Sequence, residues 1–537
     1  MINNNFDQSI ELFDTTLRDG TQGEGINLSV DDKLQIASRL DEFGINIIEG
    51  GWPGSNPRDM EFFKRSKSEL KLNQASLCAF GSTARSLYAI DSDKNLNELL
   101  KSETEFVSIF GKCWSLHSQQ GLGLSPNENA ELIYRSIEFL VKMGRKVIFD
   151  AEHFFDGFNQ STEFTVKMIN SAVEGGAKVI VLCDTNGGTL PDDIEKATQF
   201  ITNKFNVRIG IHAHNDGGLA VANTLTSVKA GVTHIQGTIN GVGERCGNVS
   251  LSSVIPNLIL KMKRKTKQPL ILKNLTSINN YIYEIMNIHP DDKAPFVGKS
   301  AFAHKGGIHV SAVIKNPEMY EHIIPSLIGN NQRVLVSDLS GKSNINYKAK
   351  ELNISLEKNT TLTRKLVQKI KLLEFEGFQF ESAEASFEIM LKEALGEFTP
   401  YFEVLDSRIT INYNPKGLPR VDAMLKIYVN GEIDHTIADG NGPVNALNSA
   451  LKKSLQRFFP ELENVKLTDY KVRVLNGMQG TESKVRVLIE SSDGENSWTT
   501  VGVSVNIIEA SWQALRDSFN YKLLRSKIER KKYVKSL

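Results

Sequence analysis

Short apolar runs recur through the first half of the chain, and each is followed by a longer stretch with apolar residues at helical spacing. Near-continuous apolar runs of strand length indicate parallel strands buried on both faces, separated by helices. Eight such units in about 250 residues match the count and size of a TIM barrel. A doubly wound sheet is the alternative, but the regular spacing favours closure. The expected strands lie at 10–16, 45–51, 75–80, 105–111, 146–152, 178–185, 208–214 and 233–239.

The alternation of short runs and helices stops after about residue 265. The segment 275–400 has helical patterning, and from 400 onward alternating strands and helices return in the order strand, strand, helix, strand, strand, helix. This order is typical of a small α+β domain. We therefore expect a (β/α)8 barrel over residues 1–270, helical linker subdomains over 271–398 and an α+β domain over 399–537.

Composition and charge exclude several classes of protein. The 63 Lys and Arg residues balance 63 Asp and Glu residues, so no overall field would attract nucleic acid or anionic lipid. The chain has no apolar run of about 18 residues that could span a membrane, and its start lacks the pattern of a signal peptide. Its four cysteines are scattered without a CxxC pair, which fits a reducing compartment. We expect a cytoplasmic protein that binds neither nucleic acid nor membrane.

Ionisable residues gather at the ends of the expected strands. In a TIM barrel the carboxyl ends of the strands surround one mouth, where active sites form. Turn residues such as Gly, Ser and Asn would be the ordinary occupants of these positions, so the charged groups indicate an active site. The polar residues at strand ends are Asp14, Arg18, Asp19, Glu49, Glu152, Asp184, Thr185, His212, His214 and Asn248.

His212 and His214 are two residues apart in a strand, so their side chains point to the same face. With Asp19 from the first strand they supply two imidazoles and a carboxylate, a set that leaves coordination positions open for catalysis. Such ligands suit Zn²⁺, Mn²⁺, Mg²⁺ and Fe²⁺ alike. We expect Asn215 and Asp216 to orient the rings. A pair of hydrogen-bonded surface histidines is the alternative.

Arg18 stands beside the proposed metal ligand Asp19. A guanidinium there either locks a neighbouring carboxylate such as Glu49 or Glu152, or shares an anionic substrate oxygen with the metal. The two roles are compatible, since one edge of the guanidinium can meet the carboxylate while the other meets the substrate.

Three motifs in order carry a family resemblance: DTTLRDG at 14–20, HAHND at 212–216 and GVGERCGN at 241–248. With them the chain resembles the homocitrate/isopropylmalate/citramalate synthase family of the DRE-TIM metallolyase superfamily, whose members condense acetyl-CoA with a 2-oxoacid in a metal-dependent barrel. IEGGWPGSNPRD at 48–59, FDAEHFFDGF at 149–158 and AFAHKGGIHVSAV at 301–313 look like the citramalate synthase branch. The resemblance covers essentially the whole chain.

The resemblance implies roles for individual residues where the motifs match. Arg18 would hold the keto oxygen of the 2-oxoacid and Thr185 its carboxylate, while His309 would remove a proton from acetyl-CoA. The implied groups are the metal ligands Asp19, His212, His214 and Asn248 for zinc, manganese or magnesium, the substrate-binding residues Arg18, Asp19, His117 and Thr185, and the catalytic residues Arg18, Glu152, His309 and Tyr320.

The resemblance also implies the reaction and its control. Pyruvate and acetyl-CoA would give citramalate and CoA for isoleucine biosynthesis. The C-terminal segment resembles a LeuA-type allosteric and dimerisation domain, which implies a homodimer inhibited by isoleucine. Isopropylmalate synthase, which uses 2-oxoisovalerate, is the nearest alternative. A C–C lyase or a metal-dependent hydrolase are alternatives of other classes. The appended domain argues against the lyase, and the position of HxH on the seventh strand argues against the hydrolase.

Overall fold

The computed structural model describes residues 8–354, 356, 360–413, 417, 420–475 and 483–536. The chain forms two compact units, residues 1–302 with 322–332 and residues 303–321 with 333–537. Each unit is described by itself.

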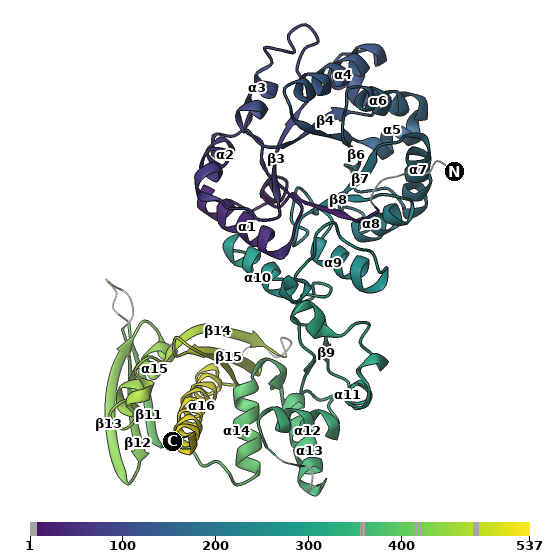
Figure 1. The fold of residues 1–537 in the computed structure, drawn as a ribbon. Helices are drawn as coiled ribbons and strands as arrows, with labels where there is room; N and C mark the ends of the chain where they lie inside the picture. Colours follow the sequence, from purple (N-terminus) through teal and green to yellow (C-terminus); the bar gives the residue numbers. More distant parts are fainter. Residues whose placement is uncertain are drawn as a thin grey trace. The chain divides into compact units, whose positions relative to one another are not determined.

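The first unit is built around a closed barrel of eight parallel strands, as the sequence predicts (Figure 1). Each strand pairs with its neighbours in chain order, and β1 pairs with β8 in parallel to close the barrel. The strands are β1 (Glu11–Asp14), β2 (Ile47–Gly51), β3 (Ser76–Ser82), β4 (Phe106–Lys112), β5 (Lys146–Glu152), β6 (Val179–Asp184), β7 (Arg208–Ala213) and β8 (His234–Gly237).

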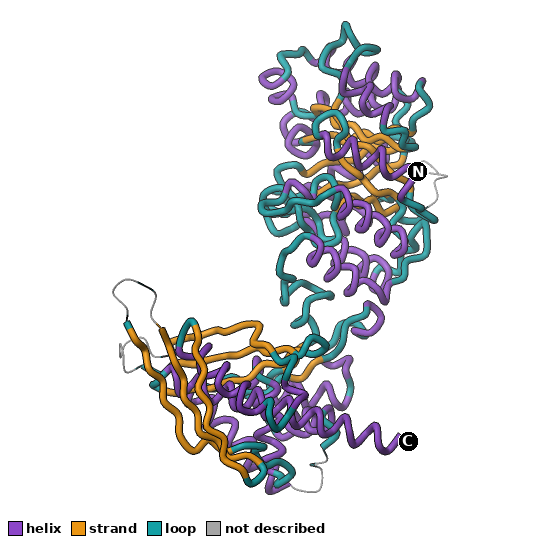
Figure 2. The backbone as a smooth tube through the Cα atoms, turned by 90° about the vertical axis from the view of Figure 1, so that its left-hand side faces the viewer, coloured by secondary structure: helices purple, strands orange, loops and turns teal. Residues whose placement is uncertain are grey.

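Helices surround these strands, as Figure 2 shows. Ser29 and Ser125 begin two of them with capping boxes, in which the serine side chain accepts from a backbone N–H three residues on. The helices are α1 (Val30–Phe43), α2 (Pro57–Glu69), α3 (Lys94–Lys101), α4 (Pro126–Lys142), α5 (Phe154–Gln160), α6 (Thr162–Glu174), α7 (Pro191–Lys204), α8 (Ala220–Lys229), α9 (Leu251–Pro256) and α10 (Leu275–Ile285).

The barrel strands bury side chains on both faces, so the barrel is a packed core and not a pore. One large cluster joins the strands to the helices. A second, smaller cluster takes one residue each from β1, β2, β3 and β5 and three from β6: Phe13, Ile47, Cys78, Ile148, Val179, Val181 and Cys183. This packing closes the barrel below the carboxyl ends of the strands, where the polar residues gather.

The second unit begins with short strands and helices and continues with two three-stranded antiparallel sheets, each followed by a helix. The first part holds β9 (Ala303–His304), α11 (Gly307–Lys315), β10 (Arg333–Val334), α12 (Lys342–Glu351), α13 (Thr360–Glu376) and α14 (Glu384–Ala394). The second part holds β11 (Glu403–Asn412), β12 (Arg420–Val429), β13 (Glu432–Gly440), α15 (Pro443–Leu455), β14 (Lys466–Val474), β15 (Val485–Ser492), β16 (Ser497–Ser504) and α16 (Ile507–Ser536).

The predicted order of two strands before each helix is wrong, because each half has three. The second of the strands expected after residue 400 is the stretch RVDAMLKIYVNGEI, which instead turns back at Asn430 and Gly431. Both residues have positive φ, 51° and 95°, as a tight two-residue hairpin requires. The Asn-Gly pair was the sequence signal for the missed strand β13.

Within the described residues, no helix is long and apolar enough to cross a membrane.

Candidate metal centre and active site

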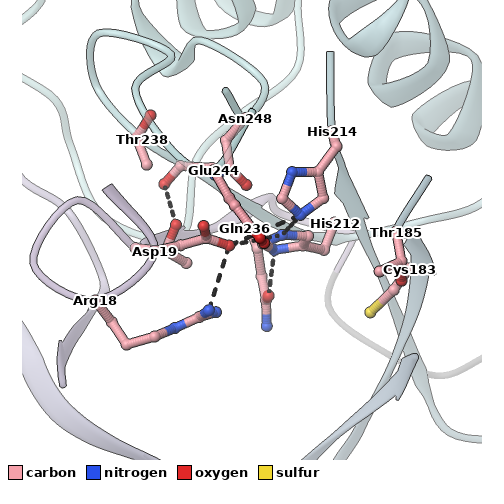
Figure 3. Close-up of polar contacts among 12 residues, drawn as sticks. Arg18, Asp19, Cys183, Thr185, His212, His214, Gln236, Thr238, Glu244 and Asn248 are labelled. Carbon is pink, nitrogen blue, oxygen red and sulfur yellow. Dashed lines mark hydrogen bonds and ion pairs between the residues drawn. The ribbon is translucent and has the colours of Figure 1, made fainter. Parts of the chain in front are cut away.

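Asp19, His212 and His214 meet at the mouth of the barrel (Figure 3). Asp19 lies in the loop after β1, His212 is in β7, and His214 follows β7 by one residue. Their ligand-type atoms all lie within 4.8 Å of one another. The Nε2 atoms of His212 and His214 are 3.4 Å and 3.8 Å from Asp19 Oδ2, so both rings present the same nitrogen to one point.

A hydrogen-bond relay from the neighbouring strand fixes the His212 ring. Gln236 Nε2 donates to Asp150 Oδ1 at 3.1 Å, so its Oε1 is left to face His212 Nδ1 at 3.0 Å. The Nδ1 atom must then carry the hydrogen, which leaves the lone pair of Nε2 free for a metal. Ser108 Oγ donates to the other oxygen of Asp150 at 2.7 Å. The relay selects the tautomer that a metal ligand needs.

The expectation that Asn215 and Asp216 orient the histidine rings is wrong. Asn215 Oδ1 accepts from the backbone N–H of Ala220, at the start of α8. Asp216 pairs with Arg245 through both carboxylate oxygens, at 2.8 and 2.9 Å. These side chains order the loops after β7 and β8 instead.

Arg18 is held on three sides at the mouth. Its Nε donates to Glu49 Oε2 at 2.7 Å, its Nη1 is 3.3 Å from Asp19 Oδ2, and its guanidinium lies 3.8 Å above the centre of the Phe80 ring. Glu49 is thus the carboxylate that fixes the Arg18 side chain. Glu152, the other candidate, forms its ion pair with Lys112. A guanidinium fixed in this way is a preorganised donor for an anionic oxygen.

The charge states of Asp19 and His214 match those of metal ligands, whereas burial lowers the pKa of His212 but Asp19 outweighs it and raises that pKa overall. Burial alone would raise the pKa of Asp19, but Arg18 and the two histidines outweigh it and hold the pKa well below its usual range. Burial, with the neighbouring His212, lowers the pKa of His214 to about 4. Burial also raises the pKa of Glu49 to about 7, although Arg18 opposes the shift. An ionised carboxylate and a neutral imidazole are the forms that bind metal.

Unpaired buried atoms at the site also fit a metal. Asp19 Oδ1 and Asn248 Oδ1 are buried without a hydrogen-bond partner among the described residues. Buried polar atoms are rarely left unpaired without an ion, water or ligand. Asn248 forms an isolated antiparallel bridge with His214, and Figure 3 shows its side chain beside that of His214. The donor set of nitrogen and oxygen atoms suits a divalent cation.

A cavity of about 220 Å³ opens beside these ligands. Thr185 and Glu152 line it, as expected of residues at the ends of β6 and β5. Its lining residues are Arg18, Asp19, Gln22, Trp52, Phe80, Phe110, Asp150, Glu152, Cys183, Thr185, His212, His214 and Glu244. The three aromatic rings contact one another with centroids 5.6–5.7 Å apart and form one apolar wall. The cavity therefore combines cationic, hydrogen-bonding and apolar surfaces for a small anion.

The remaining expected residues lie elsewhere. His117 is in the short helical turn after β4, where it packs against Trp114 and His153 and does not line the cavity. Burial and the neighbouring His153 lower its pKa. His309 and Tyr320 belong to the second unit, where their rings pack with centroids 4.3 Å apart. The roles of these three residues stay predictions.

The sequence interpretation missed Gln236, although a signal for it was present. Gln236 is the Cα partner of His212 in the pairing of β7 with β8. Side chains of paired residues in adjacent parallel strands share a face. Aligning the two predicted strands would have placed the amide beside the imidazole.

Comparison with known proteins identifies the family of this chain. Three family models match in order: HMGL-like at residues 9–282, homocitrate synthase post-HMGL domain-like at 296–377 and the LeuA allosteric (dimerisation) domain at 381–523. The chain is 50% identical to the (R)-citramalate synthase of Geobacter sulfurreducens, over 96% of this chain and 98% of that protein. It is 48% identical to the (R)-citramalate synthase of Aquifex aeolicus, over 97% and 99%.

A relative with a different name is more distant. The 2-isopropylmalate synthase of Methanocaldococcus jannaschii is 29% identical over 96% of this chain and 95% of that protein. The chain therefore belongs to the HMGL-like family, in the group that contains the (R)-citramalate synthases.

Proposed function

We propose that this protein is an (R)-citramalate synthase, which condenses acetyl-CoA with pyruvate to give citramalate and CoA. The observation that carries the proposal is the convergence of Asp19, His212 and His214 beside Arg18, in a chain 50% identical to a curated (R)-citramalate synthase. Citramalate enters the route to isoleucine, and we place the reaction in that pathway.

The metal would be held by Asp19, His212 and His214, whose ligand-type atoms lie within 4.8 Å of one another. We add Asn248, because its Oδ1 is buried and unpaired and its backbone is bridged to that of His214. A divalent cation bound there would supply Lewis-acid polarisation of a keto group and would stabilise negative charge that develops near it. Zinc, manganese and magnesium all accept this donor set.

The chain's own residues would recognise the two ends of pyruvate. Arg18 presents a fixed guanidinium to the keto oxygen, where negative charge develops as the ketone is attacked. Thr185 offers a hydroxyl to the carboxylate. The apolar wall of Trp52, Phe80 and Phe110 offers a surface for the methyl group of pyruvate.

Carbon–carbon bond formation requires a base for acetyl-CoA. We assign this step to His309, supported by Tyr320, because histidine exchanges protons near neutral pH. The base takes a methyl proton, the resulting enolate carbon attacks the keto carbon, and the keto oxygen takes up a proton. Water then cleaves the thioester, which gives a carboxylate and the CoA thiol and makes the overall reaction irreversible. Glu152, held by Lys112, is our candidate for positioning this water.

We also propose that the chain has three functional regions: a catalytic barrel over 1–270, linker subdomains that contribute to catalysis over 271–398, and a regulatory domain over 399–537. The match to a LeuA allosteric domain at 381–523 supports control by an end product, for which we name isoleucine, and a homodimeric assembly.

The experiment is an assay of CoA release with acetyl-CoA and either pyruvate or 2-oxoisovalerate. We expect turnover with pyruvate and citramalate of the R configuration as the product, identified by chiral chromatography. A preference for 2-oxoisovalerate would make the protein a 2-isopropylmalate synthase. An Asp19→Asn variant that keeps full activity would show that the metal group is misassigned.

A further inference from the structure

The chain between β5 and α5 turns at His153, in an unusual backbone conformation. His153 has φ 56° and ψ 36°, in the left-handed region that residues with a β-carbon rarely adopt. It directly follows Glu152 at the mouth of the barrel, and its side chain is buried. A strained conformation persists only where its surroundings hold it, and such positions cluster at functional sites.

The imidazole of His153 is anchored on two sides. Its ring lies 4.2 Å from that of His117 and 5.4 Å from that of Trp114, measured between centroids. Its Nδ1 is 3.0 Å from Asp156 Oδ2, in the first turn of α5. Because ring packing and a hydrogen bond act together, the side chain can hold the backbone in the left-handed region.

A second contact ties the same anchor to β6. Asn186 Nδ2 donates to Asp156 Oδ2 at 3.0 Å, the oxygen that His153 also contacts. Asn186 directly follows Thr185 in the chain. The ends of β5 and β6 are thus joined by a closed ring of contacts that runs through His153, Asp156, Asn186 and Thr185.

The backbone of His153 donates a hydrogen bond to Thr185, a residue that lines the cavity. The His153 N–H donates to Thr185 Oγ1 at 2.8 Å, and Arg245 fixes the Thr185 carbonyl oxygen at 2.7 Å. Since the hydroxyl oxygen accepts from His153, its own hydrogen can be donated elsewhere. Within the described chain this hydrogen has no acceptor, and Thr185 lines the cavity beside Asp19. An ionised carboxylate can only accept hydrogen bonds, so it is a matching partner.

We propose that His153 is a positioning residue for substrate binding: its anchored left-handed backbone aims its amide at Thr185 Oγ1, so that the Thr185 hydroxyl donates to the carboxylate of the 2-oxoacid. The inference rests on the proposed function, because it takes Thr185 as a donor to pyruvate. In this role the imidazole acts through backbone conformation and not by proton transfer.

Comparing alanine with glycine at position 153 separates these two roles. His153→Ala loses the anchor and keeps a β-carbon, so its backbone leaves the left-handed region and the amide turns away. We expect the KM for pyruvate to rise about 10-fold, the size of one hydrogen bond to a charged group. The kcat and the KM for acetyl-CoA should change less than about 3-fold, since uniform binding is what is lost. His153→Gly should recover most of the loss, because glycine adopts positive φ without strain.

A double-mutant cycle with Thr185→Val tests whether His153 acts through Thr185. We expect His153→Ala to add nothing to the KM of the Thr185→Val variant, because the hydroxyl that it positions is already absent. His289→Ala is the matched control, since His289 is exposed in the same unit and bonds to the carbonyl of Pro290. Its KM for pyruvate should equal that of the wild type.

Two results would overturn the proposal: an unchanged KM for pyruvate in His153→Ala, or a glycine variant as impaired as the alanine variant. If His153→Ala does not fold, hydrogen exchange of the His153 amide in the wild type tests the proposal instead. An amide that exchanges without protection would refute its hydrogen bond to Thr185 Oγ1. Wild-type protein that releases no CoA with pyruvate would instead refute the proposed function. If the wild type is active and His153→Ala has an unchanged KM for pyruvate, only the positioning role of His153 is refuted.

Discussion

Gln236 gives the sharpest test of how the metal site is organised. Replacing it by Leu keeps a buried side chain of similar length but removes both ends of the relay from Asp150 to His212. His212 Nδ1 then has no acceptor that fixes its tautomer, and Asp150 Oδ1 loses its donor. Both atoms belong to buried residues, so water cannot replace these partners without a rearrangement.

The size of the effect follows from these two lost contacts. Loss of a partner that orients a metal-binding histidine weakens metal affinity by about 10–100-fold, which corresponds to roughly 1.4–2.7 kcal/mol. Each orphaned buried group also lowers the free energy of unfolding by about 1–3 kcal/mol. Gln236→Leu should therefore bind metal less tightly and unfold more easily. Gln236→Glu keeps an acceptor for His212 and should retain more of the affinity.

Isothermal titration of the chelated protein with Zn²⁺ or Mn²⁺ measures the affinity, and urea unfolding measures the stability. Gln199→Leu is a suitable control, because Gln199 is exposed on α7 and its side chain bonds only to Glu195 within the described residues. This control should match the wild type in both measurements. A Gln236→Leu variant with wild-type metal affinity would refute the relay's role in holding His212.

Three further predictions concern stability, catalysis and control. Burial would raise the pKa of Glu11, but His234 and Lys267 outweigh it and lower this pKa overall. The ionised Glu11 side chain therefore stabilises the fold above the usual carboxyl pKa, and this stabilisation is lost as pH falls through the lowered pKa. Glu11→Gln should thus destabilise the protein by about 3 kcal/mol at neutral pH and by less in acid, and an equal loss at both pH values in urea unfolding would contradict this. His309→Ala should lower kcat by roughly 10²–10⁴-fold, whereas a change in KM alone would argue against its role as the base. A chain ending at residue 398 should lose inhibition by isoleucine, and inhibition that persists would rule out the C-terminal domain as the inhibitor's site.

The barrel could be predicted from the sequence because its signals are local. A strand buried on both faces must be apolar throughout, so runs such as KVIVLCDT stand out without knowledge of their neighbours. The HxH pair was equally visible, since alternation in one strand places His212 and His214 on the same side. Closure of the barrel, which brings the first strand close to the last strands, is enough to place Asp19 near the two histidines.

Other parts of the site depend on contacts between distant segments. The bond from Gln236 to His212 depends on the register of two strands, and the pairing of Asp216 with Arg245 depends on two loops. The left-handed backbone of His153 is held by ring packing against His117, in the turn after β4, and by the carboxylate of Asp156 in α5. No periodicity in the sequence encodes such contacts. The missed hairpin at Asn430 was different, since the Asn-Gly signal was present in the sequence.

We propose above that a metal held by Asp19, His212 and His214 supports the condensation of acetyl-CoA with pyruvate. The direct measurement is CoA release from pyruvate and acetyl-CoA by protein that has been stripped with chelator and titrated with Mn²⁺ or Zn²⁺, compared with a folded His212→Ala variant treated identically. We predict that activity disappears with the metal, returns at about one equivalent per chain as expected for a single catalytic site, and does not return in the variant. Activity that survives chelation, or that returns fully in His212→Ala, would contradict it.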